Sequence, residues 1–107
     1  MRVEYTFDEA KIKENGYSRE RIYSALNEEY SKRKFVCSRA DDVLTFDSTG
    51  HKDDLSTVFT LTRQLANSDW FLETAVSYLF YINDTAEPED FLINIRRLRR
   101  KPLKKEV

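Results

Sequence analysis

Residues 70–82, WFLETAVSYLFYI, are the most hydrophobic stretch of the chain, and the conformation they adopt decides the fold. On a helical wheel their apolar side chains run nearly all the way round, and only Glu73 and Ser77 lie on a polar edge. A helix that is apolar on every side is a central, buried one. The triplets at 67–69 (NSD) and 83–85 (NDT) mark its ends. The sequence therefore predicts a central helix over residues 70–82, with Trp70 in the core.

The N-terminal segment predicts a strand and two helices. Residues 3–7 (VEYTF) alternate apolar and polar side chains, which is the pattern of a half-buried strand. Asp8 can cap a short helix that Gly16 ends as a left-handed C-cap. Ser18 then caps a second helix, which runs to about Arg33. One arc of this second helix is apolar, and it consists of Ile22, Tyr23, Leu26 and Tyr30.

The middle of the chain predicts a hairpin and a third helix. Residues 35–39 and 43–47 are short β-prone runs, joined by a polar turn. Asp53 or Asp54 can cap the helix that follows. One face of that helix carries Leu55, Val58, Phe59, Thr62 and Leu65. Its residues 57–62 could instead form a strand.

The last predicted helix begins near Pro88, which suits a first turn. Pro102 disfavours helical backbone at Lys101, so the helix should end there. Its apolar face consists of Phe91, Leu92, Ile95 and Leu98, and Arg96, Arg97 and Arg100 point the other way.

Together these elements predict one α+β domain over residues 1–101, followed by a basic tail over residues 102–107. We expect a short antiparallel sheet, made of the N-terminal strand and the hairpin, packed against about five helices. The expected order is β-α-α-β-β-α-α-α.

Charge is distributed unevenly along the chain. Residues 1–95 carry eleven basic and eighteen acidic side chains, a net charge of −7, whereas residues 96–107 carry seven basic side chains and one acidic, a net charge of +6. A patch of one sign can select a charged partner, which makes this end a candidate binding surface for nucleic acid or an acidic protein. The candidate residues are Arg96, Arg97, Arg99, Arg100, Lys101, Lys104 and Lys105. An ordinary solvated helix end, or contact with the chain's own acidic body, are the alternatives.

Residues 12–26 (IKENGYSRERIYSAL) resemble the helix-turn-helix of bacterial DNA-binding proteins. In that motif a glycine turn and a serine cap precede the recognition helix, and Gly16 and Ser18 match this pattern. The resemblance implies that Arg19 and Arg21 read bases or phosphates. A strand precedes the segment where the motif has a helix, and acidic residues such as Glu20 would lie near phosphates. An ordinary helical hairpin is the alternative.

Residues for catalysis or metal binding are sparse. His51 is the single histidine and lies in a predicted turn, while Cys37, the single cysteine, lies in a predicted strand. No spacing favours a nucleophile–base pair. The calcium-loop spacing of oxygen ligands is absent. We therefore expect a non-enzymatic protein with no cofactor and no metal.

Several segments together resemble small uncharacterised proteins of mobile elements in Gram-positive gut bacteria. The similar segments are Tyr5-x-Phe7, residues 12–17 (IKENGY), the Cys37 hairpin and residues 69–71 (DWF). The resemblance implies a bacterial source but no activity or site residue.

Compartment and assembly follow from composition. A single cysteine excludes an internal disulfide and fits a reducing compartment. The first residues (MRVEY) lack a signal-peptide core, and thirteen residues at 70–82 are fewer than the roughly twenty of a bilayer span. We expect a cytoplasmic accessory or protein-interaction domain without membrane contact, as a monomer or a weak head-to-tail dimer. A DNA-binding regulator is the alternative function.

Overall fold

The computed structural model describes residues 1–40 and 42–100, with the backbone alone for residues 98–100. The α+β class, the five helices and the antiparallel sheet are confirmed over these residues, and the predicted elements occur in the predicted order. Two further strands lie before the last helix. The elements are β1 (Arg2–Phe7), α1 (Glu9–Glu14), α2 (Arg19–Ser31), β2 (Val36–Ala40), β3 (Val43–Asp47), α3 (Asp54–Ala66), α4 (Asp69–Thr74), β4 (Ala75–Tyr81), β5 (Glu89–Asp90) and α5 (Phe91–Arg100).

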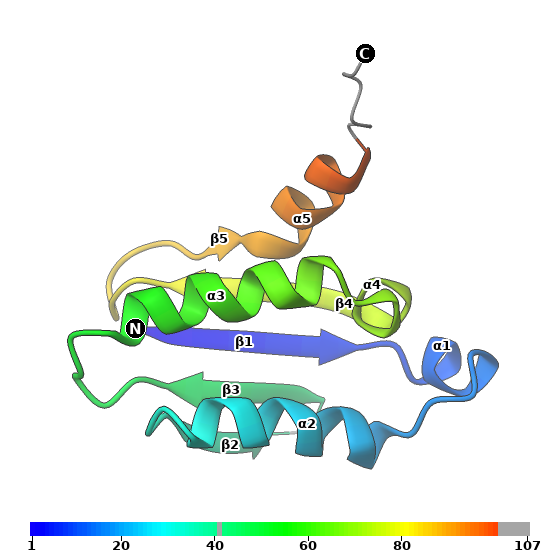
Figure 1. Ribbon diagram of the computed structural model, residues 1–107, viewed down its shortest axis with the longest axis horizontal. Coiled ribbons are helices and arrows are strands. Elements are labelled where there is room, and N and C mark those ends of the chain that lie inside the picture. Colours follow the sequence, from blue (N-terminus) through cyan, green and yellow to red (C-terminus); the bar gives the residue numbers. More distant parts are fainter. Residues whose placement is uncertain (41, 101–107) are drawn as a thin grey trace.

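The five strands form one sheet in the order β2-β3-β1-β4-β5, so the first strand of the chain becomes the central one. The helices α1 and α2 connect β1 to β2, and β3 lies between those strands. In the same way α3 and α4 connect β3 to β4, and β1 lies between them. Two interleaved β-α-β units with antiparallel neighbours are the ferredoxin-like arrangement. Here it is extended by β5 and α5 (Figure 1).

The predicted central helix over residues 70–82 is wrong beyond Thr74. Helix α4 ends at Thr74, and Ala75–Tyr81 form β4, which pairs antiparallel with β1. Burial alternates along β4, with Tyr78 and Phe80 buried and Leu79 half-buried on the opposite face. Because both faces of this strand carry apolar side chains, the period of two is concealed in the sequence.

The predicted start of the last helix also needs correction. Pro88 lies outside the helix, which begins at Phe91, because Glu89 and Asp90 form β5 beside β4. The Asp90 side chain accepts a hydrogen bond of 3.0 Å from the backbone N–H of Ile93 and so caps α5. No helix in the described part of the chain has both the length and the apolar composition to cross a bilayer.

The local signals around the first two helices are confirmed, whereas Asp53, the N-cap residue of α3, makes no side-chain capping hydrogen bond. The Asp8 carboxylate accepts from the backbone N–H groups of Ala10 and Lys11, and Ser18 caps α2. Gly16 has φ +75°, a left-handed conformation that side chains rarely adopt. Residues 57–62 are helical, as part of α3.

All the larger helices lie on one face of the sheet, with α2 over β2 and β3 and α3 over β1 and β4 (Figure 1). The core lies between these layers and is rich in aromatic rings, with Tyr5 of β1 fully buried at its centre. Its ring stacks on Tyr78 at 4.4 Å and meets Phe46 and Phe71 edge-on. The opposite face of β1, with Arg2, Glu4 and Thr6, is at least partly exposed.

Candidate functional site

A groove runs between α2 on one side and α3 and α4 on the other. Its larger hollow, of about 430 Å³, is lined by Tyr17, Ser18, Arg21, Ile22, Ala25 and Trp70. A smaller hollow of about 160 Å³ is lined by Ala25, Glu28, Leu61, Gln64, Leu65 and Trp70. Because both hollows share Ala25 and Trp70, they adjoin, and together we call them the interhelical groove.

The groove exists because the two covering helices pack against different neighbours. Helix α2 approaches β2, whereas α3 approaches α4 and α5. On the α2 side, Ala25 is small and exposed, so the space between α2 and α3 stays open. A larger side chain at this position would fill it. The floor is apolar, because Ile22, Leu61 and Leu65 are core residues whose edges reach the groove.

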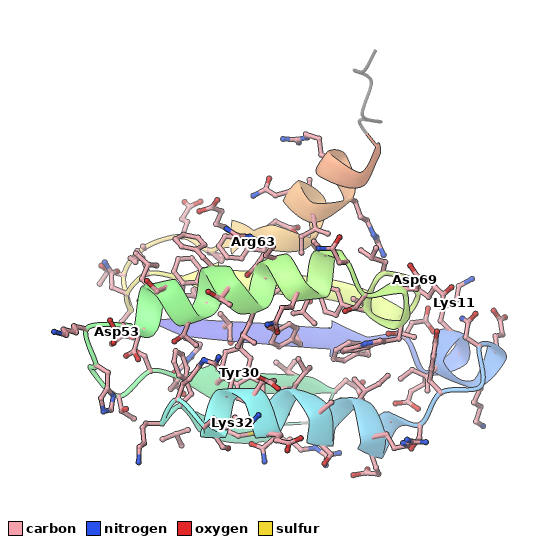
Figure 2. All side chains as sticks on the ribbon, in the orientation of Figure 1. Lys11, Tyr30, Lys32, Asp53, Arg63 and Asp69 are labelled. Atoms are coloured by element: carbon pink, nitrogen blue, oxygen red, sulfur yellow. The ribbon has the colours of Figure 1, made fainter. Side chains whose placement is uncertain are left out.

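Trp70 is held on a fixed support. Its ring meets Phe71 edge-on at 5.9 Å, and Phe71 is fully buried. The Thr74 hydroxyl donates a 2.6 Å hydrogen bond to the carbonyl of Trp70, and the Asp8 backbone N–H donates to the carbonyl of Thr74 at 2.8 Å. Figure 2 shows Lys11 of α1 and Asp69 of α4 at the same end of the molecule, where these contacts join the two helices.

The mouth of the groove is closed on one side by a contact between distant segments. The hydroxyl of Tyr17, in the turn before α2, donates a 2.7 Å hydrogen bond to Glu73 Oε1 of α4. This hydrogen bond to a carboxylate raises the pKa of Tyr17 above its ordinary value. The turn that carries Gly16 is therefore tied to α4, and the larger hollow has a defined wall.

Two unpaired charges line the α2 side of the groove. Arg21 and Glu28 lie seven residues apart, which places them on the same side of a helix and about 10 Å apart along its axis. Neither side chain forms an ion pair within the described residues. The neighbouring Glu29 is different, because Lys32 and Arg33 lie 3.5 Å and 3.3 Å from its carboxylate. The groove is thus positive at the start of α2 and negative two turns later.

The two arginines predicted to read DNA are in different situations. Arg19 is partly exposed and is engaged by other residues of the chain: its guanidinium lies 3.0 Å from Glu9 and 3.4 Å from Asp42, and over the ring of Tyr23. Arg21 is exposed and lines the interhelical groove. The structure therefore does not bring Arg19 and Arg21 together on one free surface.

The predicted basic face of the last helix is only partly described. Arg96 is exposed, and its Nη2 donates 3.1 Å hydrogen bonds to the carbonyls of Leu72 and Ala75, so its guanidinium is held against the junction of α4 and β4. Arg97 is exposed and forms no ion pair with a described residue. Arg99 and Arg100 lie in α5, and nothing is described of their side chains, whereas Lys101, Lys104 and Lys105 lie outside the described residues.

The candidate catalytic residues are not assembled into a site. His51 Nδ1 lies 3.0 Å from the Thr49 hydroxyl in an exposed turn. Cys37 is half-buried on β2, and burial raises the pKa of its thiol although Arg39 acts in the opposite direction. A raised pKa leaves less thiolate, which is the nucleophilic form. Among the residues that the structure describes, no three His, Cys, Asp or Glu side chains lie close enough to hold a metal ion.

Sequence patterns did not reveal the interhelical groove. The apolar pattern of residues 70–82 predicts Trp70 in the core, whereas its side chain is only partly buried, and Ala25 lies on the polar arc of α2. The only signal was a small residue on an otherwise polar helix face, which is common and uninformative on its own.

Comparison of the chain with protein-family models, curated proteins and solved structures gives no significant match.

Proposed function

We propose that this chain is a non-catalytic protein-interaction domain that binds an amphipathic helix of a partner protein in the interhelical groove. The observation that carries this function is a groove with an apolar floor and Trp70 at its centre, which no described segment of the chain fills. Helices bind such grooves through apolar side chains on one face, and tryptophan is a frequent source of binding energy at interfaces. A bacterial cytoplasmic setting fits the single cysteine and the resemblance noted above.

The charges that line the groove define the chemistry of the partner. An acidic side chain would neutralise Arg21, and a basic side chain two helical turns away would neutralise Glu28. Between them, an aliphatic or aromatic side chain would contact Trp70 and Leu65. A partner helix with an acidic side chain, a basic side chain two turns away and an apolar face fits this pattern. A helix with two like charges at these positions would repel either Arg21 or Glu28.

Trp70 is the single tryptophan, so its fluorescence reports occupancy of the groove. The probes are three short alanine-rich helical peptides that share a leucine face and differ at two positions seven residues apart. One peptide carries Glu and Lys there, the second two Glu, and the third two Lys. We expect the Glu/Lys peptide to shift the Trp70 emission at the lowest concentration, because it alone matches both charges.

Charge reversal and steric block test the site itself. Arg21→Glu should change the preference to the peptide with two Lys, and Glu28→Lys to the peptide with two Glu. Ala25→Arg should block the groove, whereas Ser24→Arg adds the same charge at the next position, outside the groove, and should leave binding unchanged. If the three peptides bind equally, or Ala25→Arg binds as well as Ser24→Arg, the groove is not the binding site.

The DNA-binding alternative has less support. Arg19 is engaged within the molecule, and the outward face of α2 carries Glu20 and Glu28 as well as Arg21. Single-stranded RNA would need aromatic side chains on the open sheet face, as in RNA-binding modules built on a four-stranded sheet. The open faces of β1 and β3 carry no aromatic residue; they present Arg2, Glu4, Thr6, Val43, Thr45 and Asp47. The neighbouring strand β4 adds one aromatic ring to this face, Tyr81, whose hydroxyl donates a 3.2 Å hydrogen bond to Glu4 and so lies beside a carboxylate that would repel phosphates.

Titration of labelled duplex DNA, followed by fluorescence anisotropy, separates the two functions. Contact with four phosphates would give a log–log salt dependence with a slope of about −3.6. We expect no binding at physiological salt, because residues 1–95 carry a net charge of −7. Binding with that slope, abolished by Arg97→Glu, would favour the regulator.

A further inference from the structure

The strand β2 is an open edge of the sheet. It lies at one end of the strand order, and four of its five residues are exposed. The other edge, β5, has two residues and leads directly into α5. Proteins commonly protect an edge strand by making it short or by adding prolines, bulges or several charges. Strand β2 has none of these features, since Arg39 is its one charged residue and Val36 is 57% exposed.

The register of the hairpin shows which main-chain groups of β2 are free. Ala40 and Val43 face each other with two residues between them in the sequence, which makes them a hydrogen-bonded pair. Such pairs alternate along an antiparallel ladder, so Ser38 also bonds to β3, and Cys37 and Arg39 do not. The N–H and C=O groups of Cys37 and Arg39 therefore point out of the sheet.

These free groups are symmetric about Ser38. In a two-fold antiparallel pairing centred on Ser38, Cys37 faces the partner's Arg39, and each of the two such pairs exchanges two hydrogen bonds. A centre on Arg39 would place two like charges opposite each other, which is destabilising. A centre on Cys37 would require the N–H of Phe35, which already donates to the carbonyl of Tyr30 at 3.1 Å. The register centred on Ser38 uses the free groups of both strands and places no like charges directly opposite each other, because the two Arg39 residues are diagonal neighbours.

We propose that β2 is a self-association site, at which a second copy of this chain pairs antiparallel about Ser38 and joins two sheets into one of ten strands. On the open face Val36 meets the partner's Ala40, which covers the exposed valine. On the helix face the partner's Arg39 lies beside Cys37, which lines a hollow of about 200 Å³ between α2 and β2 together with Glu20 and Asn27. This association is independent of the interhelical groove, because no residue of β2 lines the groove.

Sedimentation of the full chain tests the use of the free main-chain groups. Arg39→Pro removes a backbone N–H that points out of the sheet and makes no hydrogen bond to β3. The fold should therefore tolerate this substitution, because proline is accepted in edge strands at such positions. Arg39→Ala removes the same side chain but keeps the N–H. We expect Arg39→Pro to weaken dimerisation at least about tenfold relative to Arg39→Ala, with unchanged circular dichroism for both. Equal dimerisation of the two variants would overturn the proposal, as would a wild-type chain that stays monomeric at millimolar concentration.

Disulfide trapping tests the register, and its result does not depend on whether the Arg39→Pro variant folds. In a Cys37→Ala background, Ser38→Cys places two thiols on the two-fold axis, in a pair whose Cα atoms are about 4.5 Å apart, within disulfide range. Ala40→Cys places them more than about 10 Å apart. We expect rapid oxidation to a covalent dimer for Ser38→Cys alone, at both low and high salt. Equal cross-linking of the two variants would contradict the register, and cross-linking confined to low salt would favour a head-to-tail electrostatic dimer instead.

Discussion

The hydroxyl oxygens of Tyr5 and Tyr30 lie 2.6 Å apart in the core, so the central strand and α2 share a buried hydrogen bond. Tyr78, stacked on Tyr5, makes a second such contact, with its hydroxyl 2.6 Å from Thr62 of α3. Each covering helix is therefore attached to the sheet by a polar contact inside an aromatic core. Since a buried hydroxyl without a partner is costly, these contacts favour one arrangement of the helices over others.

The Tyr5–Tyr30 contact should appear as coupling between the two residues. Tyr30→Phe leaves the buried hydroxyl of Tyr5 without this partner, and we expect a loss of about 1–2 kcal/mol in the free energy of unfolding. The double variant with Tyr5→Phe should cost less than the sum of the single variants, because it removes both hydroxyls together. Urea denaturation of the four proteins measures the coupling, and strictly additive losses would show that the hydroxyls do not interact.

Stability should fall at alkaline pH. Burial raises the pKa of Tyr5 and Tyr30 well above the ordinary value and raises that of Tyr78 as well. Below pH about 10 these tyrosines are protonated in both states, so their contribution is fully present. Above it the unfolded chain loses protons that the folded chain keeps, and the free energy of unfolding decreases by about 1.4 kcal/mol per pH unit for each tyrosine.

Urea midpoints between pH 8 and pH 11.5 measure this dependence. The tyrosinate absorbance of Tyr5, Tyr30 and Tyr78 should appear only when the protein unfolds. Constant midpoints across this range would show that the buried hydroxyls ionise freely in the folded state.

Neighbouring Trp70 and Phe71 should differ in their contribution to stability. Phe71 is fully buried and its ring contacts Tyr5, Phe7 and Tyr78, so Phe71→Ala should cost about 3–5 kcal/mol. Trp70→Ala should cost about 1–2 kcal/mol, because one side of its ring already faces the groove. Chemical denaturation measures the free energy of unfolding of both variants. An equal loss would place Trp70 in the core, as the helical pattern of residues 70–82 predicts.

Arg96 and Arg97 provide a matched pair of substitutions in α5. Arg96→Ala removes two hydrogen bonds to the carbonyls at the junction of α4 and β4, and we expect a loss of about 1–3 kcal/mol. Arg97 is also exposed, and no side-chain hydrogen bond to a described residue holds it, so Arg97→Ala should change stability by less than about 0.5 kcal/mol. Thermal denaturation of both variants distinguishes a structural role for Arg96 from a general effect of charge.

Much of the fold could be predicted because its signals are local. The caps at Asp8 and Ser18, the left-handed Gly16 and the alternation over residues 3–7 each depend on contacts within a few residues. Local backbone preferences and side-chain hydrogen bonds specify such features before any distant segment is in place. The sequence by itself therefore determined the class of fold, the hairpin and the positions of the first three helices.

Only the tertiary structure decided the conformation of residues 75–81 and the position of the groove. An apolar run of this length is compatible with a buried helix or with a strand that is buried on one face. Residues 75–81 form β4 because the second edge of β1 has N–H and C=O groups that need hydrogen-bond partners. The groove likewise combines residues of α2, such as Arg21 and Ala25, with Trp70 of α4, which are more than forty positions apart in the chain. No local pattern carries that information. The groove depends on the separation of α2 and α3, and that separation is set by how each helix packs on the sheet.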